Sequence, residues 1–189
     1  MLRLDYSGCG ESEGVFEDGT LDIWRDDALA IIRHVTDGPV ILVGSSMGGW
    51  LMVLVAEALG AQVAGLVGIA AAPDFTRWGY TDAEKAQIMA EGQIARPSGY
   101  GYDPLVTTRA FWQSGEANLT LDREITVDGP VRLLHGQNDA DIPWQIATKL
   151  ASALRSSDVQ TVLVKGGDHR LSRDADIALL IDTVAKLAI

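Results

Sequence analysis

Apolar residues recur along the first half of the chain in two alternating patterns. Between residues 20 and 35 they fall at every third or fourth position, which predicts an amphipathic helix capped near its first residue. Unbroken apolar runs at Val40–Val43 and Val63–Ala72 predict strands buried in a parallel sheet. The almost wholly apolar run Met47–Leu59, which Gly60 ends, predicts a buried helix. Strands that alternate with helices indicate the α/β class.

A segment between Pro73 and Pro130 interrupts this alternation. It contains two short helical patterns, Asp82–Glu91 and Pro104–Ser114, around a glycine- and tyrosine-rich loop at Ser98–Tyr102. We interpret residues from about 74 to about 129 as a small helical cap inserted into a single domain that spans residues 1–189. The remaining expected elements are strands Val131–Leu134 and Gln160–Val164, and helices Trp144–Leu154 and Ser172–Leu187.

The composition limits the class of partner. With 189 residues and 47% hydrophobic content, the chain can bury one sizeable core but hardly two. Its formal net charge of -11 would repel nucleic acid and anionic membranes, which leaves small molecules and other proteins. Cys9 is the single cysteine, which excludes an internal disulfide and a multi-cysteine metal site. The sequence has no secretory signal pattern and no apolar run of membrane-spanning length, so we expect a cytoplasmic protein without membrane insertion.

A loop rich in glycine and acidic residues follows the short apolar start Met1–Leu4, which we expect to be the end of a strand. The glycines at positions 8, 10 and 14 do not have the spacing of a dinucleotide fingerprint, and Glu11 and Glu13 would repel a pyrophosphate. We therefore expect a structural loop in which the glycines permit turns and Asp5 anchors the segment.

The junction between a predicted strand and a predicted helix carries a candidate nucleophile. Ser46 lies between Gly44 and Gly48, a spacing typical of a sharp turn that lifts a serine hydroxyl above the sheet, with glycines that avoid Cβ collisions. Ser45 lacks this spacing. The helix that begins at Met47 would point unpaired N–H groups at an oxyanion formed on Ser46. The same string also fits a plain tight turn, but the flanking strand and helix favour a nucleophile.

A serine nucleophile needs a histidine base, which a carboxylate orients. Of the three histidines, His34 lies in the first predicted helix, where we expect a solvated surface position, and His135 ends a predicted strand. His169 lies in a loop at the carboxyl edge of the sheet and fits the order serine, acid, histidine, so it is the better candidate base. The loop after His135 offers Asp139 and Asp141 as the acid, and we prefer Asp139.

Three large side chains of the expected cap have two interpretations. Trp78, Phe111 and Trp112 would either pack the cap down or line the roof of a substrate-binding pocket. We favour packing and retain substrate binding as an open prediction.

Three segments in order resemble the α/β-hydrolase superfamily over the whole length of the chain: Asp5-x-x-Gly8-x-Gly10-x-Ser12, the turn Gly44–Gly48, and His135-Gly-x-x-Asp139-x-x-Ile142-Pro143. The resemblance implies the α/β-hydrolase fold, a mostly parallel sheet with helices on both faces and a small helical cap. In the family pattern the aspartate three residues after His-Gly is the catalytic acid. This implies that role for Asp139 and leaves Asp141 as a loop or cap-contact residue.

A narrower similarity is to the palmitoyl-protein thioesterase and mycophenolic acid acyl-glucuronide esterase family and its bacterial relatives. It rests on the segments Asp5–Gly10, Gly44–Trp50, Gly68–Thr76 and Ala140–Trp144. This similarity implies hydrolysis of an acyl ester or thioester through an acyl-enzyme, a reaction that needs no cofactor and no metal.

The chain departs from the family pattern at its start. Family members carry three further strands, a helix and an oxyanion-loop glycine segment before the position of Met1. Met1–Leu4 would then be the fourth strand of the family sheet, and the third, which flanks the strand before Ser46, would be absent. The absent loop would also have supplied the second oxyanion N–H, which leaves the Met47 N–H. A sheet that is open at this edge is expected to be either unstable or self-associating.

Together these features predict a serine hydrolase. Ser46 would attack an acyl carbonyl, His169 would move the proton, and Asp139 would hold the imidazole, while the Met47 N–H would contribute to the oxyanion hole. The alternative is a catalytically weak, truncated hydrolase that acts as a binding or interaction protein. A haloperoxidase or dehalogenase is less favoured, because a dehalogenase needs an aspartate in place of Ser46.

Overall fold

The computed structural model describes residues 1–97 and 104–188, so the expected loop at Ser98–Tyr102 lies outside the described residues. The chain divides into two compact units. The first unit consists of Met1–Ile31 and Asp74–Leu119, and the second of Ile32–Pro73 and Thr120–Ile189. Asp74–Leu119 lies within the segment expected as a cap, and the organisation as a single domain stays a prediction.

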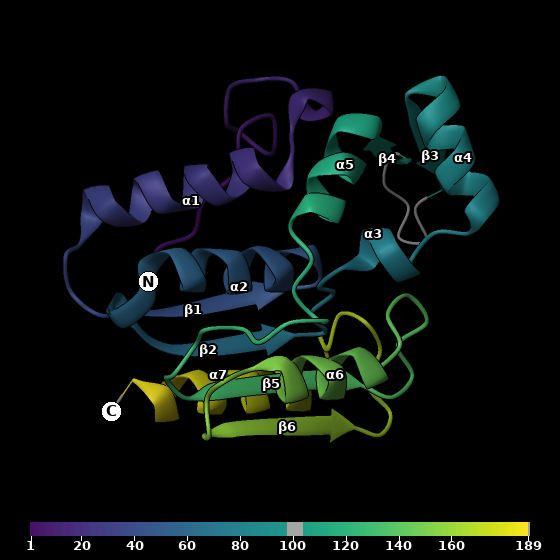
Figure 1. Cartoon of the computed structure of the whole chain (residues 1–189). Helices are drawn as coiled ribbons and strands as arrows, with labels where there is room; N and C mark the ends of the chain where they lie inside the picture. Colours follow the sequence, from purple (N-terminus) through teal and green to yellow (C-terminus); the bar gives the residue numbers. More distant parts are fainter. Residues whose placement is uncertain (98–103, 189) are drawn as a thin grey trace. The chain divides into compact units, whose positions relative to one another are not determined.

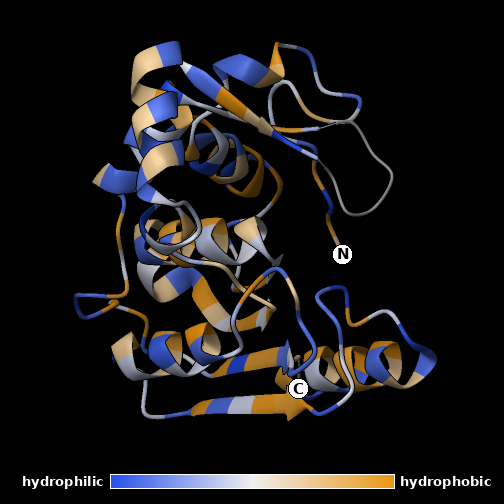
Figure 2. Ribbon diagram, turned by 90° about the vertical axis from the view of Figure 1, so that its right-hand side faces the viewer, coloured by the Kyte–Doolittle hydropathy of each residue, from blue (hydrophilic) through white to orange (hydrophobic). Residues whose placement is uncertain are grey.

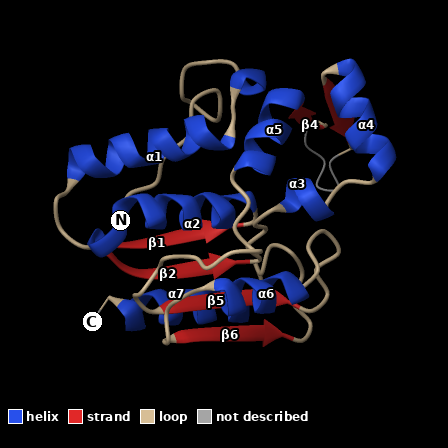
Figure 3. Ribbon diagram, in the orientation of Figure 1, coloured by secondary structure: helices blue, strands red, loops and turns tan. Residues whose placement is uncertain are grey.

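The second unit is built on a parallel sheet (Figures 1 and 3). Within the described residues the strands lie in the order β1 (Val40–Ser45), β2 (Val63–Ile69), β5 (Val131–Gly136), β6 (Val159–Val164), and each neighbouring pair is parallel. All of these strands lie where the apolar runs predict them. The expected α/β class is therefore confirmed.

Helices of the second unit cover both faces of this sheet. They are α2 (Met47–Leu59), α6 (Gln145–Ala153) and α7 (Asp174–Leu187). Leu66 of β2 packs in one cluster with Val53 of α2 and Leu150 of α6, whereas the next residue, Val67, packs with Leu180 of α7. Neighbouring strand residues point to opposite faces, so a strand covered on both sides must be apolar throughout. Hydrophobic residues accordingly recur along the strands in Figure 2.

The first helices begin and end where the sequence predicts. In α1 (Leu21–Val35), Thr20 Oγ1 accepts a hydrogen bond from the Ile23 N–H at 3.2 Å and so caps the helix start. Gly60 ends α2 with a φ of 55° while its N–H donates to the Ala56 carbonyl. None of the helices in the described part of the chain is long and apolar enough to cross a membrane.

The first unit contains a short antiparallel hairpin that the sequence analysis did not predict. Its further elements are α3 (Phe75–Trp78), α4 (Asp82–Glu91), β3 (Gln93–Arg96), β4 (Leu105–Thr108) and α5 (Arg109–Ala117). The helix expected over Pro104–Ser114 was wrong in its first part, because that part is the strand β4. The β-branched run at 106–108 favours a strand, and the Thr108 side chain then caps α5 by accepting the Phe111 N–H.

The start of the chain forms a structural loop rather than a strand. Residues 1–4 lie outside any helix or strand, so the strand expected at Met1–Leu4 was wrong. A strand needs a neighbour for its backbone hydrogen bonds, and no described strand pairs with this segment. Asp5 anchors the loop as expected, because it accepts the Glu11 N–H at 3.1 Å and the Ser12 hydroxyl at 2.8 Å. A Cβ on Gly10, whose φ is 55°, would lie 2.2 Å from the Asp5 carboxylate.

Candidate active site

Ser46 occupies a strained turn between β1 and α2. Its φ of 53° and ψ of -124° are rarely adopted by a residue with a side chain. Three backbone hydrogen bonds hold the turn: the Ser46 N–H donates to the Ile69 carbonyl at 2.9 Å, and the Ser46 carbonyl accepts the N–H groups of Gly49 at 2.9 Å and Ala72 at 3.0 Å. The backbone of Ser46 is therefore fully engaged, and only its hydroxyl is left for chemistry.

Two glycines near Ser46 occupy positions where a Cβ atom would collide with the chain, and one of the two differs from the expected pair. A Cβ on Gly44 would lie 2.3 Å from the Gly48 carbonyl oxygen, so a side chain is excluded there as expected. A Cβ on Gly48 itself would meet no atom of the described chain within 4 Å apart from its own helix backbone, so the collision expected at Gly48 was wrong. Gly49 is the second constrained position, because its Cβ would lie 2.4 Å from that of Ala71.

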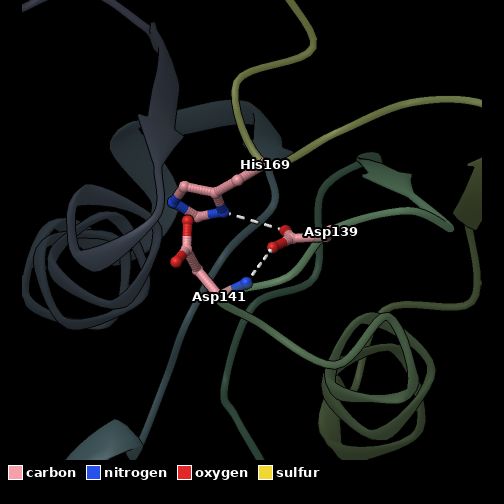
Figure 4. Close-up of side chains that lie close together, drawn as sticks. All are labelled: Asp139, Asp141 and His169. Carbon is pink, nitrogen blue, oxygen red and sulfur yellow. Dashed lines mark hydrogen bonds and ion pairs between the residues drawn. The ribbon is translucent and has the colours of Figure 1, made fainter. Parts of the chain in front are cut away.

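Ser46, His169 and Asp139 form one chain of hydrogen bonds within the second unit. His169 Nε2 lies 3.1 Å from Ser46 Oγ. On the other side of the ring, His169 Nδ1 lies 2.8 Å from Asp139 Oδ2 (Figure 4). The three residues follow the carboxyl ends of β1, β6 and β5 respectively. Because these ends of parallel strands lie at one edge of the sheet, residues that are distant in sequence meet there.

The loops that carry Asp139 and His169 are hydrogen-bonded to each other. The Asn138 N–H donates to the Gly167 carbonyl at 2.8 Å. Gly136 allows this close approach, because a Cβ there would lie 2.2 Å from the same carbonyl oxygen. The separation between the acid and the base is thus set by backbone contacts rather than by the two side chains alone.

Asp139 is a buried carboxylate surrounded by hydrogen-bond donors. Its side chain has 0% exposure. Oδ1 accepts the N–H groups of Asp141 at 2.9 Å and Ile142 at 2.8 Å, while Oδ2 faces His135 and His169. Burial by itself would raise the pKa of this carboxyl, but the hydrogen bonds from His135, His169 and Ile142 outweigh it and hold the Asp139 pKa well below its usual range. Asp139 is therefore ionised at neutral pH.

His169 is arranged to take up a proton. Burial of the ring would lower its pKa, but the hydrogen bond and charge of Asp139, with the charges of Asp141 and Asp168, outweigh that effect and raise the His169 pKa above its usual value. The side chain retains 15% exposure. An imidazole next to a serine hydroxyl and backed by a carboxylate is the arrangement of a general base.

Asp141 lies beside the imidazole of His169 (Figure 4). One ligand-type atom from each of Asp139, Asp141 and His169 lies within 4.8 Å of the others, so these are the described residues that could together approach a metal ion.

The other two histidines lie in contrasting places. His34 is exposed in the last turn of α1, as expected. His135 is completely buried at the end of β5, and its Nε2 lies 3.1 Å from both Asp139 Oδ2 and the Ile142 carbonyl oxygen. The sequence analysis gave His135 no role, although its separation of four residues from the candidate acid was a usable signal.

Two of the three large side chains of the expected cap, Phe111 and Trp112, make packing contacts within the first unit. Phe111 is buried, and its ring lies 5.6 Å from that of Trp24 between centroids. Trp112 donates its Nε1–H to the Thr76 carbonyl at 3.3 Å. These contacts agree with the favoured interpretation as packing, and a substrate-binding role for Trp78, Phe111 and Trp112 stays a prediction.

Residues 1–182 match the alpha/beta hydrolase family. The chain therefore belongs to this family, and the expected fold is confirmed. It is similar to the human protein named palmitoyl-protein thioesterase ABHD10, mitochondrial, with 40% identity over 190 residues that cover 98% of this chain and 62% of the relative. The chain thus spans less than two thirds of the length of that relative.

Two solved structures have the same fold at similar identity. The mouse alpha/beta hydrolase domain-containing protein 10 has a TM-score of 0.88 and 40% identity, and the match covers 97% of this chain and 75% of that one. A structure from Agrobacterium vitis S4 has a TM-score of 0.90 and 41% identity, with coverages of 97% and 74%. The expected resemblance to the palmitoyl-protein thioesterase family is confirmed.

Proposed function

We propose that the chain is a serine hydrolase that cleaves acyl thioesters or esters through an acyl-enzyme intermediate. The observation that carries the proposal is the unbroken hydrogen-bond chain from Ser46 Oγ through His169 to Asp139, with Ser46 on a strained turn at the start of a helix. A fixed serine, a base in contact with it and a carboxylate behind the base are the parts that nucleophilic acyl transfer requires.

In the first half of the reaction, Ser46 Oγ bonds to the acyl carbonyl carbon and its proton passes to His169 Nε2. The carbonyl π electrons move onto oxygen. Asp139 remains ionised and stabilises the imidazolium, which is consistent with its lowered pKa. The Met47 N–H at the start of α2 is aligned with the helix dipole, and it would donate to the new oxyanion.

In the second half, the oxyanion collapses and the bond to the leaving group breaks. His169 gives its proton to the departing thiolate or alkoxide, which leaves an ester on Ser46. Water then attacks that ester and His169 takes the water's proton. The second collapse breaks the bond to Ser46 Oγ, which takes the proton back from His169, and the carboxylic acid is released.

The proposed substrates are long-chain acyl thioesters, as on S-palmitoylated proteins. The support is the 40% identity to a human relative that is named a palmitoyl-protein thioesterase. The thioester substrates that this chemistry would accept carry a neutral acyl chain. The negative net charge of the chain does not oppose their binding.

The test compares a palmitoyl thioester of a short peptide with the matched palmitoyl serine ester and with a short-chain acyl thioester. We expect turnover of the palmitoyl thioester that Ser46→Ala abolishes and that Ser45→Ala leaves unchanged, since Ser45 lies outside the hydrogen-bond chain. Hydrolysis that persists in the Ser46→Ala protein would contradict the nucleophile. Hydrolysis of the short-chain substrate alone would contradict the proposed acyl class.

A further inference from the structure

The buried ring of His135 lies directly behind the candidate acid. His135 is the penultimate residue of β5, before Gly136, and has 0% exposure. Its Nε2 lies 3.1 Å from Asp139 Oδ2 and 3.1 Å from the carbonyl oxygen of Ile142. Both residues belong to the loop that follows β5. A polar side chain that is completely buried at such a place requires a partner, and these two oxygens supply it.

The two oxygens determine where the ring carries its proton. A backbone carbonyl only accepts hydrogen bonds, and an ionised carboxylate also only accepts. An unprotonated Nε2 would place its lone pair next to the lone pairs of both oxygens in a buried site, which is unfavourable. Nε2 must therefore be the protonated nitrogen. Nδ1 of His135 has no partner in the described part of the chain, so a proton there would be buried without an acceptor.

With this proton, Asp139 is surrounded on every side. Its Oδ1 accepts the N–H groups of Asp141 and Ile142, and its Oδ2 accepts from His169 and lies against the N–H of His135. A carboxylate offers about four lone-pair positions, and here each faces a donor. The donors other than His169, namely the N–H groups of Asp141, Ile142 and His135, therefore help to set the plane and the position in which the carboxylate meets His169.

We propose that His135 is a positioning residue for the catalytic acid, whose Nε2–H links Asp139 to the Ile142 end of its loop and holds the carboxylate in the plane that His169 requires. The inference rests on the proposed function, because it gives His135 a part in the reaction through Asp139. His135 does not touch substrate or the reacting atoms; it acts through the carboxylate.

The first experiment reads the histidine signals of the unaltered chain, uses two variants for assignment only, and needs no activity. Ring ¹⁵N-labelled histidine gives signals that distinguish a protonated from a bare ring nitrogen, and the chain has only three histidines. His34→Gln and His169→Gln assign two of the rings and leave His135. We expect a protonated Nε2 on His135. A bare Nε2 would overturn the inference whether or not the chain hydrolyses thioesters.

The second experiment measures whether His135 acts through Asp139. His135→Met removes the donor at similar volume, and we expect a fall in kcat of about 10- to 100-fold with little change in KM, the range for losing a hydrogen bond to a charged group. His135→Gln places an amide N–H near the position of Nε2 and should restore most of that loss. In an Asp139→Asn background, His135→Met should have almost no further effect.

Equal fractional losses from His135→Met in both backgrounds would contradict the inference, because a purely structural role gives additive effects. A loss in His135→Gln as large as in His135→Met would contradict it as well. If His135→Met does not fold, the His135→Gln kinetics and the ring signals of the unaltered chain decide. Absence of Ser46-dependent turnover would contradict the proposed function. The protonation state of His135 would then still test its contact with Asp139.

Discussion

Asp139 and Asp141 lie in one loop but in opposite environments. The Asp139 side chain has 0% exposure and is bonded to His169, whereas Asp141 is exposed and lies beside the same ring without replacing that bond. The two carboxylates therefore act on His169 differently. Asp139 sets the tautomer and orientation of the ring, and Asp141 adds negative charge near it.

The first prediction ranks these two acids. Asp139→Asn should lower turnover far more than Asp141→Asn, because loss of the orienting carboxylate leaves the wrong tautomer of His169 and costs about 10⁴-fold in the best-characterised triad. His169→Ala should be comparably damaging, and His34→Ala, at an exposed helix end, should be nearly neutral. Initial rates on one ester substrate measure all four variants. A larger loss in Asp141→Asn than in Asp139→Asn would assign the acid to Asp141.

The second prediction concerns pH. In the free enzyme His169 must be unprotonated to act as a base, so kcat/KM should rise with pH through the His169 pKa. Since that pKa is raised, the midpoint should lie above the ordinary histidine value of about 6.5. Asp141→Asn removes one stabilising charge from the imidazolium and should shift the midpoint to lower pH. The pH profile of kcat/KM for both proteins is the measurement, and an upward or absent shift would contradict the assigned role of Asp141.

Sequence reasoning identified the three members of the hydrogen-bond chain but not the residue behind them. Ser46 and His169 were predictable because the turn motif and the chain order constrain them. The role of His135 was missed, because its separation of four residues from Asp139 indicates that the two are near in the chain but not which way the ring faces. The collision expected at Gly48 failed for a similar reason, since only the backbone path shows that Gly49 is the crowded position.

At the scale of elements, periodicity predicted the strands and helices of the second unit well. These elements are buried and strongly apolar, so hydrophobic pattern decides their structure. The first unit was predicted less well, because β3 and β4 have four residues each and their pairing depends on a partner strand. Met1–Leu4 shows the converse, since an apolar run without a pairing partner does not form a strand.

The third prediction tests the contact between the two loops of the site. Gly136→Ala would place a Cβ 2.2 Å from the Gly167 carbonyl oxygen, so the loop of His169 must move away from that of Asp139. We expect at least a 10-fold loss of kcat, since small displacements of a catalytic group are costly, together with a lower Tm. Gly166→Ala is the matched control, because its Cβ would meet only the flexible end of Arg173, at 3.1 Å. Equal effects of the two substitutions would contradict this account.

At the scale of the whole molecule, β1 is one of the two edge strands of the described sheet, and β6 is the other. Among the described residues β1 pairs with β2 on one side and with no strand on the other, and its Val43 side chain is 50% exposed. Unpaired backbone groups beside an exposed apolar residue form a template for pairing with another chain.

The fourth prediction is therefore that the chain of 189 residues self-associates in solution through β1. Light scattering over a range of concentrations should give a mass above that of the monomer, and Val43→Lys should lower it, because a charge at a strand edge opposes pairing. Val35→Lys is the control, since Val35 is 53% exposed but lies in α1. A monomer at every concentration, or equal effects of both lysines, would rule out association through this strand.

The central claim is that Ser46 is the nucleophile of an acyl-transfer site. Reaction of the purified chain with a fluorophosphonate probe, followed by intact-protein and peptide mass spectrometry, tests it most directly. We predict a single adduct on Ser46, full labelling of Ser45→Ala, no labelling of Ser46→Ala, and much slower labelling of His169→Ala, because the base activates the hydroxyl. Equal labelling of the Ser46→Ala protein, or an unlabelled folded wild-type chain, would contradict the claim.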